Sequence, residues 1–167
     1  MEQTGTLEIL KQAIILEKRG HAFYQNVAKQ AKDDAVKSFF EAMAKEELSH
    51  IKVLAAQFKE YHNKGIFQAD LFDENEEIHF TLSILDSGIK EKIAAAGFEA
   101  AAISASISME QRAVKIYSKQ AEKAVDPEEK KLYLWLSTWE QVHLKVLMEI
   151  DKELMDQVWS DNSFWPF

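Results

Sequence analysis

The sequence predicts an all-α protein built as a bundle of four helices. Its 167 residues include only five glycines and two prolines, and Ala, Leu, Ile, Glu and Lys dominate. Apolar residues recur near the 3.6-residue helical period along four long stretches. A chain of this length can bury a sizeable core as one domain. We therefore expect a single domain over residues 1–167, in which two helical hairpins are joined by one long crossover.

The first hairpin is predicted from two periodic stretches. The apolar pattern that begins at Leu7 predicts a helix over about 4–31. Asp33 interrupts this pattern, which then resumes and predicts a second helix over about 34–61. Residues 62–96 form the predicted crossover, where the pattern loosens and is compatible with either extended chain or a short helix.

The second hairpin follows the crossover. Helical spacing predicts a third helix over about 98–125. Asp126 followed by Pro127 is typical of a helix start, so a fourth helix is expected over about 127–158. The aromatic tail, 159–167, is expected to dock on its own bundle or on a neighbouring subunit.

Composition excludes several classes of function. A formal net charge of −8 without a basic cluster argues against nucleic acid as a partner. Because the chain has no cysteine, it cannot form a disulfide, a Cys-ligated zinc site or an iron–sulfur centre within itself. Any metal must therefore be held by Glu, Asp or His. Without a signal-peptide pattern or an apolar run of membrane length, we expect a soluble cytoplasmic protein with no membrane partner.

An internal repeat relates the two hairpins. "LEKRGHAFYQNVAKQA" from Leu16 resembles "MEQRAVKIYSKQAEKA" from Met109, at an offset of 93 residues, and the same offset aligns "HIKVL" with "HLKVL". Glu46 aligns with Trp139, so a symmetric site cannot use it. The ligand-type residues that align are Glu17 with Glu110, Glu47 with Glu140, and His50 with His143.

These repeated residues are expected to converge in the middle of the bundle. Residues three apart share one helix face, so Glu47 presents its carboxylate beside the imidazole of His50. In an antiparallel hairpin, Glu17 and Glu47 lie at the same level because both are equally distant from the predicted turn. The second hairpin repeats this geometry. Four buried carboxylates require positive charge, and two divalent cations would supply it. Two imidazoles and several oxygens suit iron or manganese.

The pattern of Glu followed by Glu-x-x-His, repeated, resembles the ferritin-like diiron carboxylate superfamily. A tyrosine seven residues after the first glutamate is most similar to the rubrerythrin branch, here without a rubredoxin domain. The resemblance implies a ferritin-like four-helix bundle with two iron ions per chain, and it implies that Tyr24 and Tyr117 support the ligands from outside the metal shell. The implied ligands are terminal Glu17 and Glu110, bridging Glu47 and Glu140, and nitrogen donors His50 and His143.

The sequence departs from the families that it resembles at three positions. Rubrerythrins carry an extra glutamate one turn after the third-helix ligand and lack the second histidine, whereas this chain has Ala113 there and keeps His143. Leu48 occupies the position of the haem-ligating methionine of bacterioferritins, so haem is not expected. His21 aligns with Val114, which favours a role at the rim or surface.

The resemblance implies a rubrerythrin-like oxidoreductase. It would reduce peroxide or oxygen with electrons from an external donor protein or reductase, and we expect a homo-oligomer, most simply a dimer. Two alternatives remain open. One is a ferroxidase that binds or stores iron, and the other is a bundle with a redox-silent structural metal or a partner-binding role.

Overall fold

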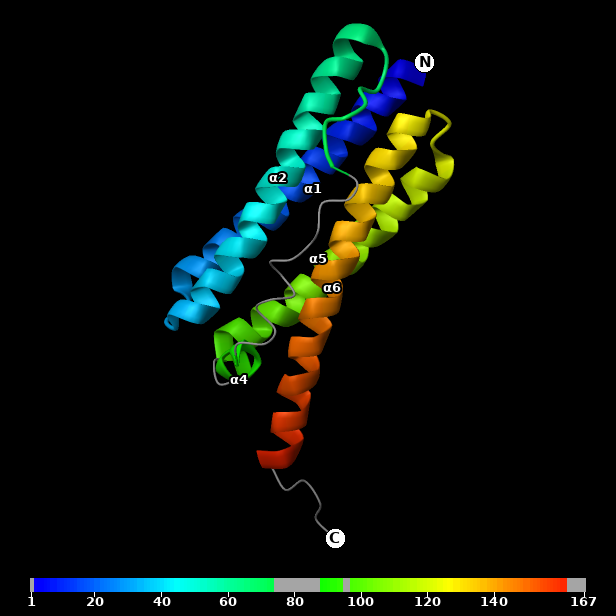
Figure 1. Cartoon of the computed structure of the whole chain (residues 1–167). Coiled ribbons are helices and arrows are strands. Elements are labelled where there is room, and N and C mark those ends of the chain that lie inside the picture. The colour runs from blue at the N-terminus through cyan, green and yellow to red at the C-terminus, as the bar shows by residue number, and fades with distance from the viewer. Residues whose placement is uncertain (1, 74–87, 95–96, 162–167) are drawn as a thin grey trace.

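The computed structural model describes residues 2–73, 88–94 and 97–161, which form an all-α four-helix bundle (Figure 1). A short helix, α4, precedes the second hairpin, and no strand occurs in the described part of the chain. The helices are α1 (Glu2–Gln30), α2 (Asp34–Lys64), α4 (Ile89–Ala94), α5 (Gly97–Lys123) and α6 (Pro127–Asp161).

Matching aspartates begin the second helix of each hairpin. The carboxylate of Asp33 accepts hydrogen bonds of 2.8 and 3.2 Å from two backbone N–H groups in the first turn of α2. Asp126 accepts bonds of 2.8 and 3.3 Å at the start of α6 in the same way. Such caps satisfy N–H groups that have no partner within a helix. Because the two aspartates are repeat partners, both hairpins turn at equivalent positions.

The two hairpins lie against each other in opposite directions. In Figure 1, the turn between α1 and α2 and the turn between α5 and α6 lie at opposite ends of the bundle. Helix α4 packs against α2, α5 and α6. The ammonium group of Lys92 on α4 also lies 3.5 Å from the carboxylate of Asp33, but both side chains are about half exposed, so this ion pair contributes little.

The apolar core consists of two clusters. The first surrounds Phe39 and Phe40, near the turn of the first hairpin, and the second surrounds Tyr133 and Trp135, near the turn of the second hairpin. Tyr24 belongs to the first cluster and Tyr117 to the second. Because every long helix contributes to the core, burial of apolar surface joins the hairpins. Buried polar and charged side chains lie in the same interior.

The helix ends differ by a few residues from those expected. Helix α2 extends beyond residue 61 to Lys64, where Gly65 adopts a left-handed conformation (φ 70°) and donates its N–H to the carbonyl of Tyr61. Helix α6 continues past residue 158, so Trp159 is helical and 63% exposed instead of starting a tail. Amphipathic patterns rarely locate such ends exactly because ends depend on caps.

The predicted crossover is partly helical, since α4 lies within residues 62–96. Its alternating apolar stretch near residues 78–84 lies outside the described residues, as does the end of the tail, 162–167. Among the described helices, none combines the length and apolar character that crossing a lipid bilayer requires.

Candidate metal centre

Six polar side chains from four helices meet inside the bundle. Each is at most 3% exposed, which is unusual for carboxylates unless they are paired or bind a metal. These are the six residues that the sequence repeat grouped together. They are Glu17 on α1, Glu47 and His50 on α2, Glu110 on α5, and Glu140 and His143 on α6.

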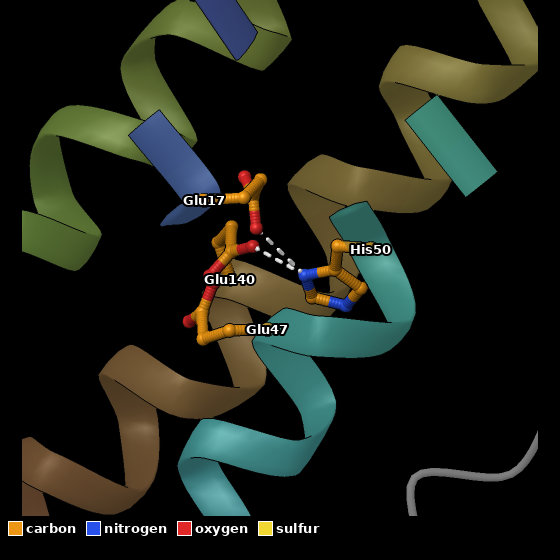
Figure 2. A group of neighbouring side chains, drawn as sticks. All are labelled: Glu17, Glu47, His50 and Glu140. Atoms are coloured by element: carbon orange, nitrogen blue, oxygen red, sulfur yellow. Dashed lines mark hydrogen bonds and ion pairs between the residues drawn. The ribbon is translucent and has the colours of Figure 1, made fainter. Parts of the chain in front are cut away.

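Their potential ligand atoms form two overlapping groups, and within each group the atoms lie within 4.8 Å of one another. The His50 position consists of Glu17, Glu47, His50 and Glu140, drawn in Figure 2. The His143 position consists of Glu47, Glu110, Glu140 and His143. Glu47 and Glu140 belong to both positions, so each can bridge two ions. Glu17 and Glu110 each belong to one.

Both histidines direct the same ring nitrogen at the carboxylates. Nδ1 of His50 lies 3.0 Å from Oε2 of Glu17 and 3.1 Å from Oε1 of Glu140. Nδ1 of His143 lies 3.2 Å from Oε2 of Glu140. The i, i+3 spacing on each helix allows this arrangement, because it stacks the two side chains on one face. Each histidine can therefore act as a nitrogen ligand through Nδ1.

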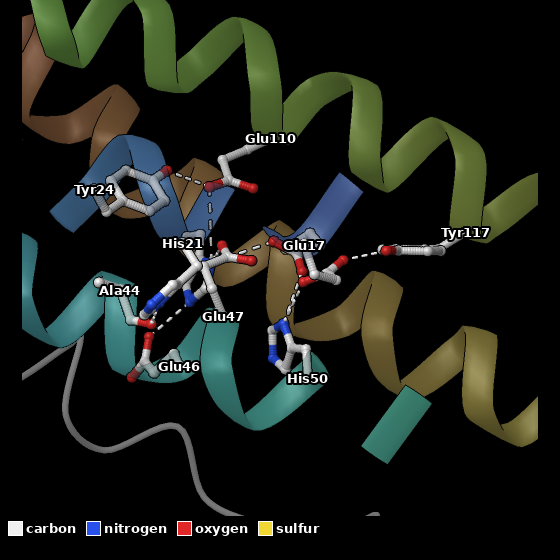
Figure 3. A network of polar contacts seen from close by, with 11 residues as sticks. Glu17, His21, Tyr24, Ala44, Glu46, Glu47, His50, Glu110 and Tyr117 are labelled. Carbon is white, nitrogen blue, oxygen red and sulfur yellow. Dashed lines mark hydrogen bonds and ion pairs between the residues drawn. The ribbon is translucent and has the colours of Figure 1, made fainter. Parts of the chain in front are cut away.

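Two buried tyrosines connect the hairpins across the site (Figure 3). The hydroxyl of Tyr24 on α1 donates a hydrogen bond to Glu110 on α5. The hydroxyl of Tyr117 on α5 donates to Glu17 on α1. Each tyrosine therefore binds a glutamate of the opposite hairpin. Each of these two glutamates belongs to only one of the two metal positions. Helix spacing alone places the tyrosines on the glutamate face of their own helices; the crossed pairing emerges only from the fold.

The carboxylates respond differently to burial. Burial raises the pKa of Glu47 well above its usual range, and the nearby charge of Glu140 adds to the rise. Burial raises the pKa of Glu110 in the same way. Burial would also raise the pKa of Glu140, but the hydrogen bond from His143 and the positive charges of both histidines hold it below the usual range. One carboxylate is thus kept ionised beside others that favour protonation.

The histidines carry the compensating charge in the metal-free protein. Burial alone would lower the pKa of His50, but the carboxylates of Glu140 and Glu17, which both lie close to its Nδ1, raise it to about 9. The pKa of His143 is also raised well above its ordinary value, by Glu140 and Glu46, against the effect of burial. In the metal-free protein, protons on the two histidines therefore balance the negative charge of the buried carboxylates. A divalent cation can replace these protons, because metal binding releases protons from its ligands.

The donor set fits two divalent ions. Nδ1 of His50 can carry one hydrogen, which goes to Glu17, and Oε1 of Glu140 is left buried without a hydrogen bond among the described residues. A buried carboxylate oxygen without a partner is costly, and a bridging ion would satisfy it. Oxygen and imidazole donors suit iron and manganese better than a soft metal.

A cavity of about 620 Å³ opens between α1 and α5 and reaches the centre. Four glutamates of the cluster line its inner end, and exposed Arg19 and Arg112 line its outer part. These arginines are repeat partners. Small molecules can therefore approach the carboxylates from this side, while the histidines lie outside the cavity lining.

Glu46 also lies at the centre, although the repeat aligns it with Trp139 and so argues against a symmetric role. Its Oε2 lies 2.6 Å from Nε2 of His143. Glu46 directly precedes the ligand Glu47 on α2, so its side chain can face α6 while that of Glu47 faces the centre. This position next to a ligand is the sequence feature that could have indicated its role. His21, expected at the rim or surface, is half-buried, and its Nδ1 lies 2.7 Å from the carbonyl oxygen of Ala44.

Gly20 also belongs to the centre, although no motif indicated it. A Cβ at this position would lie 3.1 Å from Cδ and 3.2 Å from Oε2 of Glu47. Gly20→Ala is therefore expected to displace the shared carboxylate and to weaken metal binding about 10-fold, comparable to the loss of a supporting contact. The matched control is Gly5→Ala on the same helix, where a Cβ meets nothing within 4 Å. Equal affinities in the two variants, measured by metal titration, would contradict this role of Gly20.

The fold and the site together fit the class of dinuclear carboxylate proteins with a ferritin-like bundle. The family model described as Rubrerythrin matches residues 8–150, which include all six clustered residues, and the chain belongs to this family. Comparison with curated proteins and with solved structures gave no match.

Proposed function

We propose that this chain is a dinuclear iron oxidoreductase that reduces peroxide or oxygen with electrons from an external donor. The observation that carries the proposal is the sharing of Glu47 and Glu140 between two adjacent ligand groups. Shared carboxylates hold two ions side by side, which suits a reaction that needs two electrons. Two ferrous ions would supply those electrons and Lewis acidity.

The surrounding residues have defined roles in this proposal. Glu17 and Glu110 complete the two positions, and the tyrosine hydroxyls hold the oxygens of these glutamates in place. The cavity between α1 and α5 admits a molecule as small as peroxide to the carboxylate side. The buried protonatable cluster can also provide protons, since reduction of one peroxide to two waters consumes two protons and two electrons.

The cavity favours this function over a purely structural metal. A structural site is usually closed, whereas a reactive site keeps an approach open. Ferroxidase activity remains the second candidate because the same access would serve oxygen. Accumulation of iron well beyond two ions per chain, in a large closed assembly, would favour that candidate.

The decisive experiment loads the protein anaerobically with Fe(II), removes free metal, and mixes it with peroxide or oxygen in a stopped-flow spectrophotometer. We expect about two irons per chain, and oxidation of both by one equivalent of peroxide. Glu47→Ala with Glu140→Ala is the control that should abolish the rapid phase. Tightly bound iron that reacts with neither oxidant, or no bound iron at all, would refute the proposed function.

A further inference from the structure

The two histidines differ at the ring nitrogen that points away from the carboxylates. Nε2 of His143 lies 2.6 Å from Oε2 of Glu46, whose side chain is only 12% exposed. Nε2 of His50 is buried and has no hydrogen-bond partner among the described residues. Both ring nitrogens of His143 thus contact carboxylates, whereas only Nδ1 of His50 does so among the described residues.

This difference arises from a single pair of repeat positions. The residue preceding the shared glutamate is Glu46 on α2 and Trp139 on α6. The ring of Trp139 lies edge-on to His50, with centroids 5.6 Å apart, and Trp135 lies at 5.3 Å. Two indole rings therefore lie against His50, whereas a carboxylate contacts Nε2 of His143. Trp139 also lies edge-on to His143, with centroids 6.3 Å apart.

We propose that Glu46 is a positioning residue for His143, and that it makes the His143 position bind divalent metal more tightly than the His50 position. The inference rests on the proposed function, because it concerns the same two positions. It goes beyond that function by assigning the two ions unequal affinities and by naming the residue responsible.

The physical reason is the hydrogen bond on the far side of the imidazole. A carboxylate that accepts the Nε2–H fixes the tautomer that leaves the Nδ1 lone pair free for the metal. It also fixes the orientation of the ring and makes Nδ1 a stronger donor. Loss of such a partner typically lowers metal affinity by about 10- to 100-fold. His50 lacks this support among the described residues, and its Nε2 is left buried without a partner.

Anaerobic titration of the metal-free protein with Co(II), followed by visible absorption, tests the inference. We expect two binding steps whose dissociation constants differ by about 10- to 100-fold. Glu46→Ala should weaken the tighter step by a similar factor, so that the steps merge. Glu46→Gln keeps a carbonyl acceptor without the charge and should give an intermediate affinity. Glu41→Ala, an equal charge change at an exposed position of α2, is the matched control and should leave both steps unchanged.

A second readout separates positioning from a general effect on the fold. In proton spectra of the Co(II)-loaded protein, each ligating imidazole gives a shifted, exchangeable N–H signal. Glu46→Ala should move the signal of His143 and leave that of His50 in place. Equal affinities in the native protein, or equal weakening of both steps by Glu46→Ala, would overturn the inference and leave the dinuclear site standing. Failure of the native protein to bind any Co(II) would overturn the inference together with the proposed function.

Discussion

Glu47→Ala is expected to abolish tight metal binding at both positions, whereas Glu17→Ala should abolish it at only one. The reason is geometric, since Glu47 contributes ligand atoms to both groups and Glu17 to the His50 position alone. Elemental analysis after anaerobic Fe(II) loading should show a fall from about two ions per chain to none in the first variant. In the second variant it should show a fall to about one.

The repeat supplies matched controls for this prediction. Glu140→Ala should reproduce the result of Glu47→Ala, and Glu110→Ala should reproduce that of Glu17→Ala, because each pair occupies equivalent places in the two hairpins. Far-UV circular dichroism would verify that all four variants remain helical. If Glu17→Ala loses as much bound iron as Glu47→Ala, the assignment of shared and unshared ligands is wrong.

The metal-free protein is expected to lose stability as the pH rises from about 6.5 to about 9. The pKa of His50 is about 9 in the folded chain, against an ordinary value of 6.5. A raised pKa stabilises the folded state fully below the unfolded value, and this stabilisation is lost as the pH approaches the folded value. For His50 the loss is about 3 kcal/mol, since one pKa unit corresponds to about 1.4 kcal/mol.

The neighbouring groups act in the same direction or not at all within this range. The pKa of His143 is also raised, so this histidine adds to the loss. The pKa values of Glu47 and Glu110 are raised too, so their effect has the same sign and begins at a lower pH. Glu140, with a lowered pKa, stays ionised and contributes a constant amount. A chain of this size loses about 2 to 4 °C of melting temperature per kcal/mol, so calorimetry at pH 6.5 and 9 should reveal a fall of about 10 °C.

Metal loading provides the contrast for the pH experiment. In the loaded protein the ligands are deprotonated at both pH values, and the fall should be smaller or reversed. His50→Gln should remove part of the fall in the metal-free protein. A metal-free protein whose stability rises over this pH range would show that the buried cluster is not held by protons.

The bundle and the convergence of its six polar residues follow from the sequence for an identifiable reason. The 93-residue repeat carries Glu17 onto Glu110 and His50 onto His143, and the spacing from each turn then sets their level in the bundle. Helical period and turn position are local properties, so they can be recognised without coordinates. The family match over residues 8–150 supports this part of the interpretation.

The contacts that the sequence did not reveal depend on how helices rotate against one another. Repeat symmetry argued against Glu46, whose contact with His143 joins α2 to α6. Likewise, the closeness of Gly20 to the carboxylate of Glu47 requires actual interatomic distances. The sequence left the crossover open between extended chain and a short helix, because the six residues of α4 span too few turns to show a clear period.

The crossed tyrosine contacts also bear on how the two hairpins are aligned along the bundle. Tyr24 and Tyr117 each reach a glutamate on the opposite hairpin, and Glu47 and Glu140 complete groups that include residues of both hairpins. If one hairpin slid along the other by a single helical turn, about 5.4 Å, both tyrosine contacts and both ligand groups would be lost together. Neither hairpin therefore contains a complete site, and an occupied centre is possible in only one register of the two halves.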